Sequence, residues 1–388
     1  MKKKALFVAT IYGFLNSFES NNMRILKELG YEVHCIANPY EDLIPGHAKV
    51  KTPNIDAVGG VIKHGWRCAR SPYDKNNIVA LRQLKALLKK ENFDLVHCHT
   101  PMGGVLARIA CEPYRKKGMK VIYTAHGFHF YDGAPKKNWL IYYPIEKELS
   151  RITDVLINIT LEDYNRARKE FHAGHTYYVP GVGVDLDKFK SNVDIANVRE
   201  TIGVPNDSTW LLSVGELNDN KNHENVIRAI SQIHNPLIFY TIAGEGPKRE
   251  YLEKLIQELG LQKQVRLLGY CSDVNDLYHA ADIYIHPSLR EGLSVATMEA
   301  MACGLPIIEG KIRGNVDLVD ENGGILYNPA SVEECVSSVK RGLALTTADR
   351  ESMGGHNQTK IQGFGRKTVE DKMREIYSQV SCVTDNAM

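Results

Sequence analysis

The 388-residue sequence predicts two tandem α/β domains, each built on a doubly wound parallel sheet. Apolar runs of strand length, rich in Val, Ile and Leu, alternate with amphipathic segments of helical period along almost the whole chain. Near residues 189–197 this alternation breaks into a polar stretch and then restarts, which indicates a linker near 186–200. The length agrees with two domains of roughly 100–200 residues each.

The first predicted domain comprises residues 1–187. Its strands are expected at Ala5–Thr10, Glu32–Ala37, Asp94–Cys98, Val121–Thr124 and Val155–Ile159. Its helices are expected at Asn21–Leu29, Ile78–Lys90 and Met102–Lys117. Buried strands that alternate with helices are joined by right-handed crossovers, and this connectivity gives a parallel sheet.

The second predicted domain comprises residues 188–365. Its strands are expected at Trp210–Val214, Leu237–Ala243, Val265–Leu268, Ile283–His286 and Pro306–Ile308. Its helices are expected at Glu224–Ile233, Lys248–Leu259, Ser294–Ala302 and Val332–Leu343. A loop at Gly354–Gly365 then precedes a last helix, Lys367–Val380, within a C-terminal segment 366–388 expected to pack back on the N-terminal domain.

The charge is distributed unevenly along the chain. The net charge is +2, but residues 1–190 carry +10 and the remainder carries −8. A basic half in a nearly neutral chain fits an anionic surface or substrate on one side, although solvated surface lysines give the same asymmetry. The basic half has no aromatic-interleaved stripe or zinc-finger spacing, so nucleic acid is not an expected partner.

Composition and cysteine usage favour a cytoplasmic protein. Charged residues make up 24% and hydrophobic residues 43%, which excludes wholesale disorder, and no apolar run reaches the ~18–20 residues of a membrane span. Eight scattered cysteines without a C-x-x-C pair indicate a reducing compartment. The N-terminal Met1–Lys4 and the apolar run after it resemble a signal peptide, but Tyr12 and Gly13 interrupt that run, and a first buried strand explains it better.

The segment Arg290–Pro306 is the most informative in the chain. In doubly wound sheets ligands bind beyond the carboxyl ends of the strands, so two such domains are expected to face a shared cleft. Gly292 lets the backbone approach a ligand, and the amides of Leu293, Ser294 and Val295 at a helix start suit a diphosphate. Glu291 and Glu299 can each accept hydrogen bonds from a sugar or ribose, although either glutamate alone is more often a surface residue.

This string resembles the donor site of the family-4 retaining glycosyltransferases, which carry two glutamates within E-G-x-x-x-x-x-x-E-A-M-A-C-G-x-P. The match runs through Glu291–Pro306 and continues at Arg313–Asn315 and the Gly323-Gly324 turn. The resemblance implies two Rossmann-like domains in the GT-B arrangement and a hexosyltransferase activity. It also implies that Glu291 contacts the hydroxyls of the donor sugar and that Glu299 contacts the ribose.

Other loops of the second domain fit the same family. After the first strand of this domain, the family presents an Arg and a Lys to the donor diphosphate; Lys221 matches the Lys, whereas Glu216, close after Gly215, replaces the Arg. Arg290, Arg313, the backbone amides or the helix dipole could compensate for that missing charge. Gly244 belongs to a turn similar to the family's G-x-G-P, and Tyr270 begins a segment similar to the one that lines the base pocket.

In the first domain, His126 matches the histidine that the family places beside the reacting sugar. Gly13 resembles the glycine of the first-domain loop that approaches the donor phosphates, although the usual glycine pair is absent. His97 and His99 share one strand face, but two potential ligands without a third do not make a metal site. We therefore interpret this histidine pair as structural and expect no metal in the protein.

The resemblance implies transfer with retention from a nucleotide sugar, with UDP as the expected nucleotide. The departing phosphate oxygen would accept the proton of the attacking hydroxyl, while Lys221, Glu291 and His126 act at the reacting centre. The resemblance implies that neither a metal nor another cofactor is needed, and no acidic D-x-D motif that could bind a metal stands at an expected place.

The motif set Thr124–Tyr131 together with Ser213–Asn218 resembles bacterial capsule and exopolysaccharide transferases, which build repeat units on undecaprenyl diphosphate. A lipid-diphosphate-linked saccharide is therefore the expected acceptor. The clusters Lys85, Lys89, Lys90 and Arg115–Lys117 could hold the domain peripherally on the anionic inner face of the cell membrane.

Two other functions remain open from the sequence. A UDP-sugar 2-epimerase has the same two-domain architecture and would turn over its nucleotide sugar without an acceptor. A protein that closes on a sugar nucleotide without chemistry would agree with Glu216 in the place of the Arg.

Overall fold

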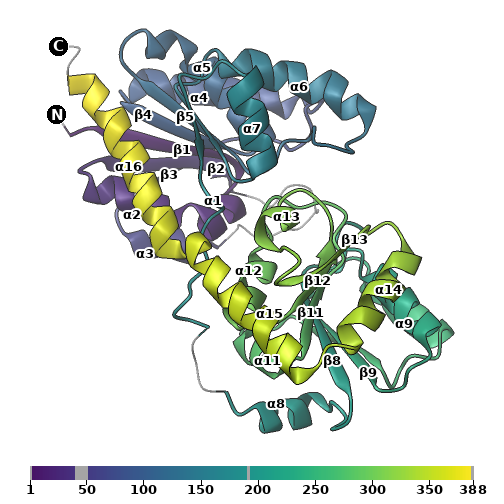
Figure 1. Cartoon of the computed structure of the whole chain (residues 1–388). Coiled ribbons are helices and arrows are strands. Elements are labelled where there is room, and N and C mark those ends of the chain that lie inside the picture. Colours follow the sequence, from purple (N-terminus) through teal and green to yellow (C-terminus); the bar gives the residue numbers. More distant parts are fainter. Residues whose placement is uncertain (1, 40–50, 190–192, 386–388) are drawn as a thin grey trace. The chain divides into compact units, whose positions relative to one another are not determined.

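A computed structural model describes residues 2–39, 51–189 and 193–385 of the chain (Figure 1). The chain forms two compact units: unit 1 is Met1–Val182 with Lys367–Met388, and unit 2 is Gly183–Arg366. The predicted division after residue 187 thus lies a few residues inside unit 2. Among the described residues, each unit contains a single parallel sheet flanked by helices, which confirms the predicted fold class.

The sheet of unit 1 has seven parallel strands in the order β3-β2-β1-β4-β5-β6-β7. Its strands are β1 (Lys4–Ile11), β2 (Glu32–Asn38), β3 (Ile62–Gly65), β4 (Leu95–His99), β5 (Lys120–Ala125), β6 (Val155–Asn158) and β7 (His175–Tyr178). The short edge strands β3 and β7 were not predicted, because neither carries a buried apolar run. The strand order reverses between β1 and β4, and such a switch point opens a crevice at the carboxyl ends of the strands.

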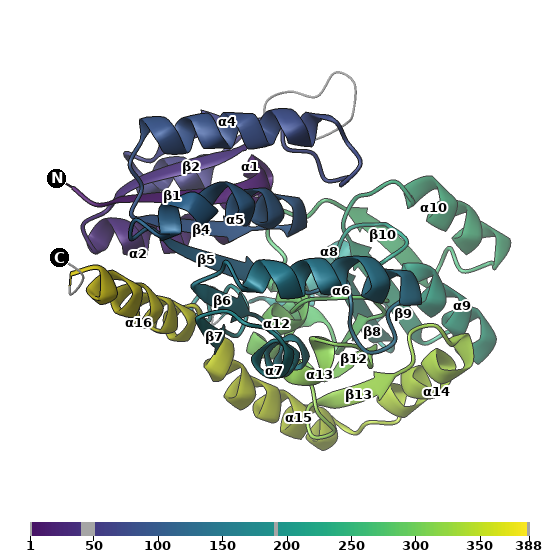
Figure 2. The same cartoon turned by 90° about the horizontal axis from the view of Figure 1, so that it is seen from above.

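Helices cover both faces of this sheet, because alternate residues of each strand point to opposite faces. Leu6 and Val8 of β1 pack with α4 (Asn76–Lys90), α5 (Pro101–Arg115), α6 (Lys136–Ser150) and α7 (Leu161–Glu170). Phe7 packs with the helices of the other face, which are α1 (Tyr12–Phe18), α2 (Ser20–Glu28), α3 (Pro53–Val58) and α16 (Arg366–Asp385). The views in Figures 1 and 2 show α16, the last helix of the chain, running along α2.

Helix α16 is held on unit 1 by apolar and polar contacts. Its buried residues Val369, Met373, Ile376, Tyr377 and Val380 join the core formed by the strands and α2. The Tyr377 hydroxyl also lies 2.7 Å from Nδ1 of His97 on β4. These contacts make the end of the chain part of unit 1.

The sheet of unit 2 has six parallel strands in the order β10-β9-β8-β11-β12-β13. They are β8 (Thr209–Val214), β9 (Ile238–Ala243), β10 (Val265–Gly269), β11 (Ile283–His286), β12 (Ile307–Gly310) and β13 (Gly324–Tyr327). One face packs against α9 (His223–Ile233), α10 (Arg249–Glu258) and α14 (Val332–Leu343). The other packs against α11 (Asn275–Ala280), α12 (Val295–Ala302) and η1 (Ile361–Phe364). The strand order reverses between β8 and β11.

The loop predicted at Gly354–Gly365 is wrong, because this segment is helical. It is formed by the end of α15 (Thr347–Lys360) and by η1. Thr346 and Asp349 form a capping box that starts α15. Gly354 is needed for close packing, since a Cβ there would lie 2.0 Å from the carbonyl oxygen of Gly304. The glycines that suggested a loop therefore include one that lets a helix pack closely.

The predicted linker also contains regular structure. Its end forms α8 (Ile195–Ile202), which Asp194 caps by accepting a hydrogen bond from the amide of Asn197 at 3.1 Å. A short helix α13 (Asn315–Leu318) follows β12.

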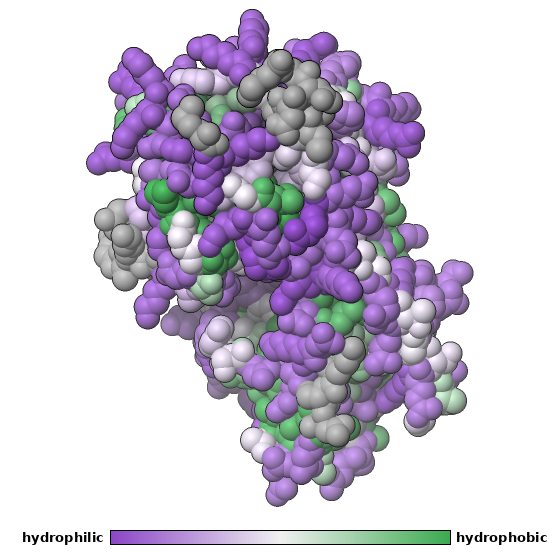
Figure 3. All heavy atoms as spheres, turned by 90° about the vertical axis from the view of Figure 1, so that its left-hand side faces the viewer, coloured by the Kyte–Doolittle hydropathy of each residue, from purple (hydrophilic) through white to green (hydrophobic). Residues whose placement is uncertain are grey.

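Within the described residues no helix is long and apolar enough to cross a bilayer. On the face shown in Figure 3, polar side chains predominate and apolar ones form small separate patches.

Candidate functional site

In unit 2 the candidate site lies at the switch point between β8 and β11. The loop after β8 and the loop after β11 are joined through the backbone: Leu289 donates a hydrogen bond to the carbonyl of Asn220 at 2.8 Å. The side chain of Asn220 donates in return to the carbonyl of Arg290 at 2.9 Å. These two bonds hold together the loops that carry Lys221 and Glu291.

The carboxylate of Glu291 is the centre of this site. Its Oε1 accepts a hydrogen bond from Nζ of Lys221 at 2.6 Å and lies 3.2 Å from Nε2 of His286, the last residue of β11. The Tyr284 hydroxyl and Ser288 Oγ lie 3.1 and 3.0 Å from the two ring nitrogens of His286. Burial raises the pKa of Glu291, but the hydrogen bond from His286 and the Lys221 charge outweigh it and hold the pKa well below its ordinary value.

Two glycines bring backbone segments into direct contact around these loops. A Cβ on Gly314 would lie 1.4 Å from the carbonyl oxygen of Gly292, and Gly314 also has a positive φ of 84°. A Cβ on Gly244 would lie 1.9 Å from the carbonyl oxygen of Gly215. Gly314 and Gly244 therefore set how closely the loops after β8, β9, β11 and β12 approach one another.

Ser294 caps helix α12, at whose start the sequence predicts phosphate-binding amides. Its buried hydroxyl accepts a hydrogen bond from the amide of Thr297 at 3.2 Å. Leu293 packs on the core beside this helix. The amides of a first helical turn have no acceptor within the helix, so those near Leu293 and Val295 lie where an anion could accept their hydrogen bonds.

Glu299 lies inside α12 and is held by a tyrosine. The hydroxyl of Tyr278, on α11, donates a hydrogen bond to Oε2 of Glu299 at 3.0 Å. Burial raises the pKa of Glu299 above its ordinary value, and the hydrogen bond from Tyr278 opposes this rise. Glu291 and Glu299 thus have different surroundings: the first carboxylate contacts the Lys221 cation and the His286 ring, whereas the second accepts from a neutral hydroxyl.

Two residues that the sequence predicts at the donor site, Glu216 and Tyr270, are exposed in the structure. Glu216 is exposed and accepts a hydrogen bond from the side chain of Asn218 at 2.8 Å. Tyr270 follows β10 and is 79% exposed. Arg313, named above as a possible substitute for the missing Arg, is buried and donates to the carbonyl of Glu291 at 3.3 Å.

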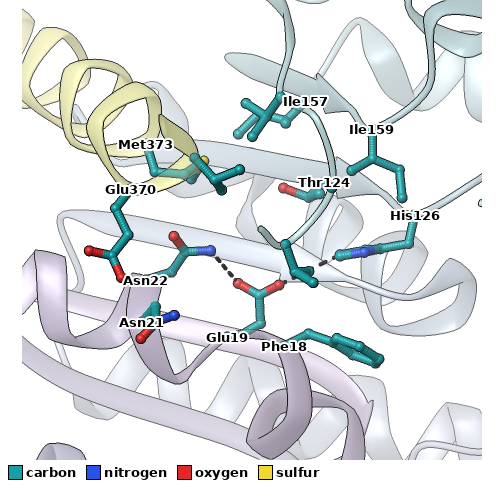
Figure 4. Close-up of a pocket in the computed structure, with 14 residues that line it drawn as sticks. Phe18, Glu19, Asn21, Asn22, Thr124, His126, Ile157, Ile159, Glu370 and Met373 are labelled. Carbon is teal, nitrogen blue, oxygen red and sulfur yellow. Dashed lines mark hydrogen bonds and ion pairs between the residues drawn. The ribbon is translucent and has the colours of Figure 1, made fainter. Parts of the chain in front are cut away.

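In unit 1, His126 directly follows β5 and lies in a group of polar side chains (Figure 4). Its Nε2 lies 3.6 Å from Oε1 of Glu19 and 3.4 Å from Nδ1 of His99, which is itself 3.3 Å from that oxygen. The side chain of Asn22 donates to the other carboxylate oxygen of Glu19 at 2.7 Å. Glu19 is only 1% exposed, so one buried carboxylate orients both histidines.

His97 lies beside His99 on β4 and extends the same group of polar side chains. Potential ligand atoms of Glu19, His97 and His99 lie within 4.8 Å of one another, so the structure supplies the third group that the sequence lacked for a metal site. Both ring nitrogens of His97 are engaged, however, by the hydroxyls of Tyr377 at 2.7 Å and Thr124 at 2.8 Å. His97 could bind a metal only by giving up one of these bonds, so we interpret the group as a hydrogen-bond network.

The structure places Gly13 in a helix and not in a loop, while its contact with the donor phosphates stays a prediction. Strand β1 ends at Ile11 and helix α1 begins at Tyr12, so Gly13 lies in the first helical turn. Tyr12 and Leu15 are buried against the sheet, and this burial favours the immediate turn from strand to helix.

Comparison with known proteins identifies the family. Residues 194–358 match the model described as glycosyl transferases group 1, and residues 5–160 match glycosyl transferase 4-like. EpsD of Bacillus subtilis (strain 168), a candidate glycosyltransferase, is 39% identical over 97% of this chain and 97% of its own length. The chain belongs to the group 1, family-4 glycosyltransferases.

Further relatives of this glycosyltransferase agree with the fold. The Escherichia coli UDP-Gal:alpha-D-GlcNAc-diphosphoundecaprenol alpha-1,3-galactosyltransferase is 32% identical over 77% of this chain and 78% of its own length. The crystal structure of Anabaena Alr3699/HepE in complex with UDP has a TM-score of 0.78 at 19% identity, and covers 98% of this chain and 100% of that one. This likeness confirms the GT-B fold and, at that identity, the fold alone.

Several residues that the structure adds to the candidate site are not among the site residues predicted from the sequence. His286, Tyr278 and Glu19 meet the predicted residues only through the fold. A signal existed for His286, which ends a buried strand just before the Glu291 loop, and for Glu19, the only acidic residue among the first 27.

Proposed function

We propose that this glycosyltransferase moves a hexose or N-acetylhexosamine from a UDP-sugar to a lipid-diphosphate-linked saccharide, with retention of configuration. The observation that carries the proposal is the cluster of Lys221, Glu291 and His286 at the switch point of unit 2. In doubly wound sheets this position binds nucleotides. The E. coli relative named above transfers Gal from UDP-Gal to a diphosphoundecaprenol-linked GlcNAc, which supports both substrate classes.

The donor would be bound by polar groups around this switch point. Lys221 and the amides at the start of α12 would bind the diphosphate and stabilise the charge that develops as it leaves. The carboxylate of Glu291 would orient the sugar hydroxyls, and that of Glu299 the ribose hydroxyls. Gly215 and Gly244 would let the nucleotide approach the backbone.

The reaction would need little more than orientation and charge stabilisation. The attacking hydroxyl of the acceptor would give its proton to the departing phosphate oxygen on the same face of the sugar. His126 would contact the reacting sugar, held in place by Glu19 and His99. We propose that neither a metal nor another cofactor takes part.

The biological setting is proposed from the relatives and from charge. The similarity to EpsD and to the motifs of capsule transferases supports a role in exopolysaccharide repeat-unit synthesis. Exposed lysines on α4 (Lys85, Lys89 and Lys90) would attract the cytoplasmic face of an anionic membrane at about 1 kcal/mol each.

A donor panel tests the proposal. The purified protein is incubated with UDP- and GDP-sugars and a lipid-diphosphate-linked monosaccharide, and the product is identified by its mass. We expect release of UDP and a mass gain of one sugar only when both substrates are present. Turnover of the nucleotide sugar without acceptor would favour an epimerase, and binding without turnover a non-catalytic protein.

A further inference from the structure

Unit 1 contains a cavity of about 550 Å³ that the donor site does not use. Thr10 at the end of β1, and Thr100 and Pro101 after β4, line its inner end. This is the switch point of the first sheet, where the strand order reverses between β1 and β4. The volume lies in the range of about 300–1,000 Å³ that is typical of ligand pockets. Figure 2 shows α5 and α6, which carry much of its wall, side by side.

The wall of this cavity is mainly apolar. Side chains from three helices form it, namely Phe14 on α1, Met102 and Val105 on α5, and Ile141, Tyr142 and Ile145 on α6. None of these belongs to the fully buried core of unit 1, so their apolar surface remains available to a ligand.

The inner end is polar and conformationally strained. Thr100 has a positive φ of 62°, a strained conformation for a β-branched residue and one that is typical of functional sites. Its hydroxyl lies 2.8 Å from that of Thr10. His129, on the segment after β5, packs against Tyr142 with ring centroids 4.7 Å apart and an interplanar angle of 32°, and it also lines the cavity.

The charges that line the cavity favour an anion. Arg70 and Glu146 are the charged side chains among its lining residues, apart from His129. Glu146 is neutralised by an ion pair with Nη2 of Arg108 at 2.8 Å, and both residues are buried. Arg70 is exposed and has no carboxylate partner in the part of the chain that the structure describes, so its charge dominates at the cavity.

Exposed apolar residues continue the wall out to the surface. Ile141 and Ile145 line the cavity and are 42% and 43% exposed, and Leu140 beside them is 78% exposed. On another wall, the lining residue Pro72 is followed by Tyr73, which is 84% exposed. A ligand with a long apolar chain could therefore leave the cavity along apolar surface.

We propose that this cavity binds the polyprenyl-diphosphate part of the acceptor. Arg70 contacts the diphosphate, and the walls on α5 and α6 contact the first isoprene units, while the rest of the chain extends past Leu140. The attached sugar then lies toward Thr10, Thr100 and His129, where His129 is the side chain placed to hydrogen-bond it. The inference rests on the proposed function, because it assigns a site to the acceptor proposed there.

A binding experiment tests this site apart from catalysis. Farnesyl diphosphate is titrated calorimetrically into the full-length protein saturated with UDP, so that the donor site is occupied. Farnesol and inorganic diphosphate are titrated separately. We expect farnesyl diphosphate to bind at least about tenfold more tightly than farnesol or inorganic diphosphate. It is the one ligand of the three that has both a diphosphate to contact Arg70 and an apolar chain to contact the walls. Equal binding of inorganic diphosphate would overturn the assignment.

Variants locate the binding. Val105→Phe fills part of the cavity, and Arg70→Ala removes its cation. Each substitution should weaken the binding of farnesyl diphosphate by about tenfold or more. Ile109→Phe, one turn along α5 and 41% exposed, and Arg67→Ala, exposed and outside the lining, are the controls and should leave it unchanged. If Val105→Phe fails to fold by thermal melting, Ile141→Glu, at a partly exposed position, makes the same test.

The outcomes separate the two proposals. Suppose that farnesyl diphosphate binds in a way that depends on Arg70 and Val105, but no sugar is transferred to any acceptor. This result would support the cavity as a binding site and refute the proposed function. Transfer to a lipid-linked acceptor with an unchanged acceptor KM in both variants would refute the site and leave the function standing.

Discussion

Nζ of Lys221 lies 2.6 Å from Oε1 of Glu291, although the two residues stand 70 positions apart and follow different strands. Both side chains are largely shielded from solvent, with 21% and 14% exposure. The pair fixes two loops at the switch point of unit 2 and pre-positions a cation there. A donor diphosphate that binds at this place would form an ion pair with Lys221, either beside its ion pair with Glu291 or instead of it.

Replacing Lys221 tests whether this lysine stabilises the charge that develops on the leaving diphosphate. We expect Lys221→Ala to lower kcat by about 10²–10³, the usual cost of removing one group that stabilises developing charge. Lys221→Arg should keep part of the activity, because it retains the charge but not the geometry. Lys248→Ala, which breaks an ion pair with exposed Asp219, is the matched control. A Lys221→Ala enzyme with near-normal turnover would remove this lysine from the mechanism.

Glu299 is expected to discriminate ribose hydroxyls. UDP and 2′,3′-dideoxy-UDP are compared by calorimetry on the wild type and on Glu299→Ala. The wild type should prefer UDP by about tenfold or more, and the variant should lose most of that preference. Glu351→Ala, on the exposed surface of α15, should preserve it. An unchanged preference in Glu299→Ala would place the ribose elsewhere.

Glu19 is expected to act through His126. Glu19→Gln keeps the size of the side chain but removes the charge that orients His126 and His99. We predict a fall in kcat of about tenfold to a hundredfold, with little change in KM for the nucleotide sugar. Glu370→Gln, in the same pocket of Figure 4 and paired with Arg24 at 2.7 Å, is the control. Equal losses in both variants would indicate a merely structural effect.

Buried histidines should make stability depend on pH. Burial lowers the pKa of His97 and of His223 to about 3, and lowers that of His99 well below its ordinary value. Below pH 6.5 the unfolded chain therefore binds protons that the folded chain does not, so the free energy of unfolding falls as pH drops from 6.5 toward 3. Each histidine contributes a slope of up to about 1.4 kcal/mol per pH unit.

Urea unfolding between pH 5 and 8 measures this slope. In His97→Asn the slope below pH 6.5 should be smaller, although the variant is less stable at pH 8 because it loses hydrogen bonds to Tyr377 and Thr124. A slope identical to that of the wild type would mean that His97 is protonated in the folded state.

Gly314 is expected to be indispensable to the donor site. Gly314→Ala would place a Cβ 1.4 Å from the carbonyl of Gly292 in a left-handed conformation, so the loop before α12 must move. We predict a lower Tm and loss of UDP binding. Gly355→Ala is a matched control: it lies in α15 with nothing within 4 Å of the added Cβ, and should stabilise that helix by about 1 kcal/mol. Normal UDP binding by Gly314→Ala would contradict the close packing.

The two α/β domains and the segment Glu291–Pro306 can be predicted from the residue pattern alone. Both depend on local order, because a buried strand or an amphipathic helix shows its period within a few turns of chain. The helix at Thr347–Lys360 was not predicted, because Gly354 and Gly355 locally suggest a loop. Gly354 is explained by the backbone of Gly304, which lies too close to leave room for a side chain.

The partners of the predicted residues become visible in the three-dimensional arrangement. Glu19 meets His126 across 107 positions, and His97 meets Tyr377 across 280. The cavity near Thr100 exists because two non-consecutive strands lie side by side at a switch point. Such contacts follow from the order of strands in a sheet, and the local pattern of one chain segment does not encode that order.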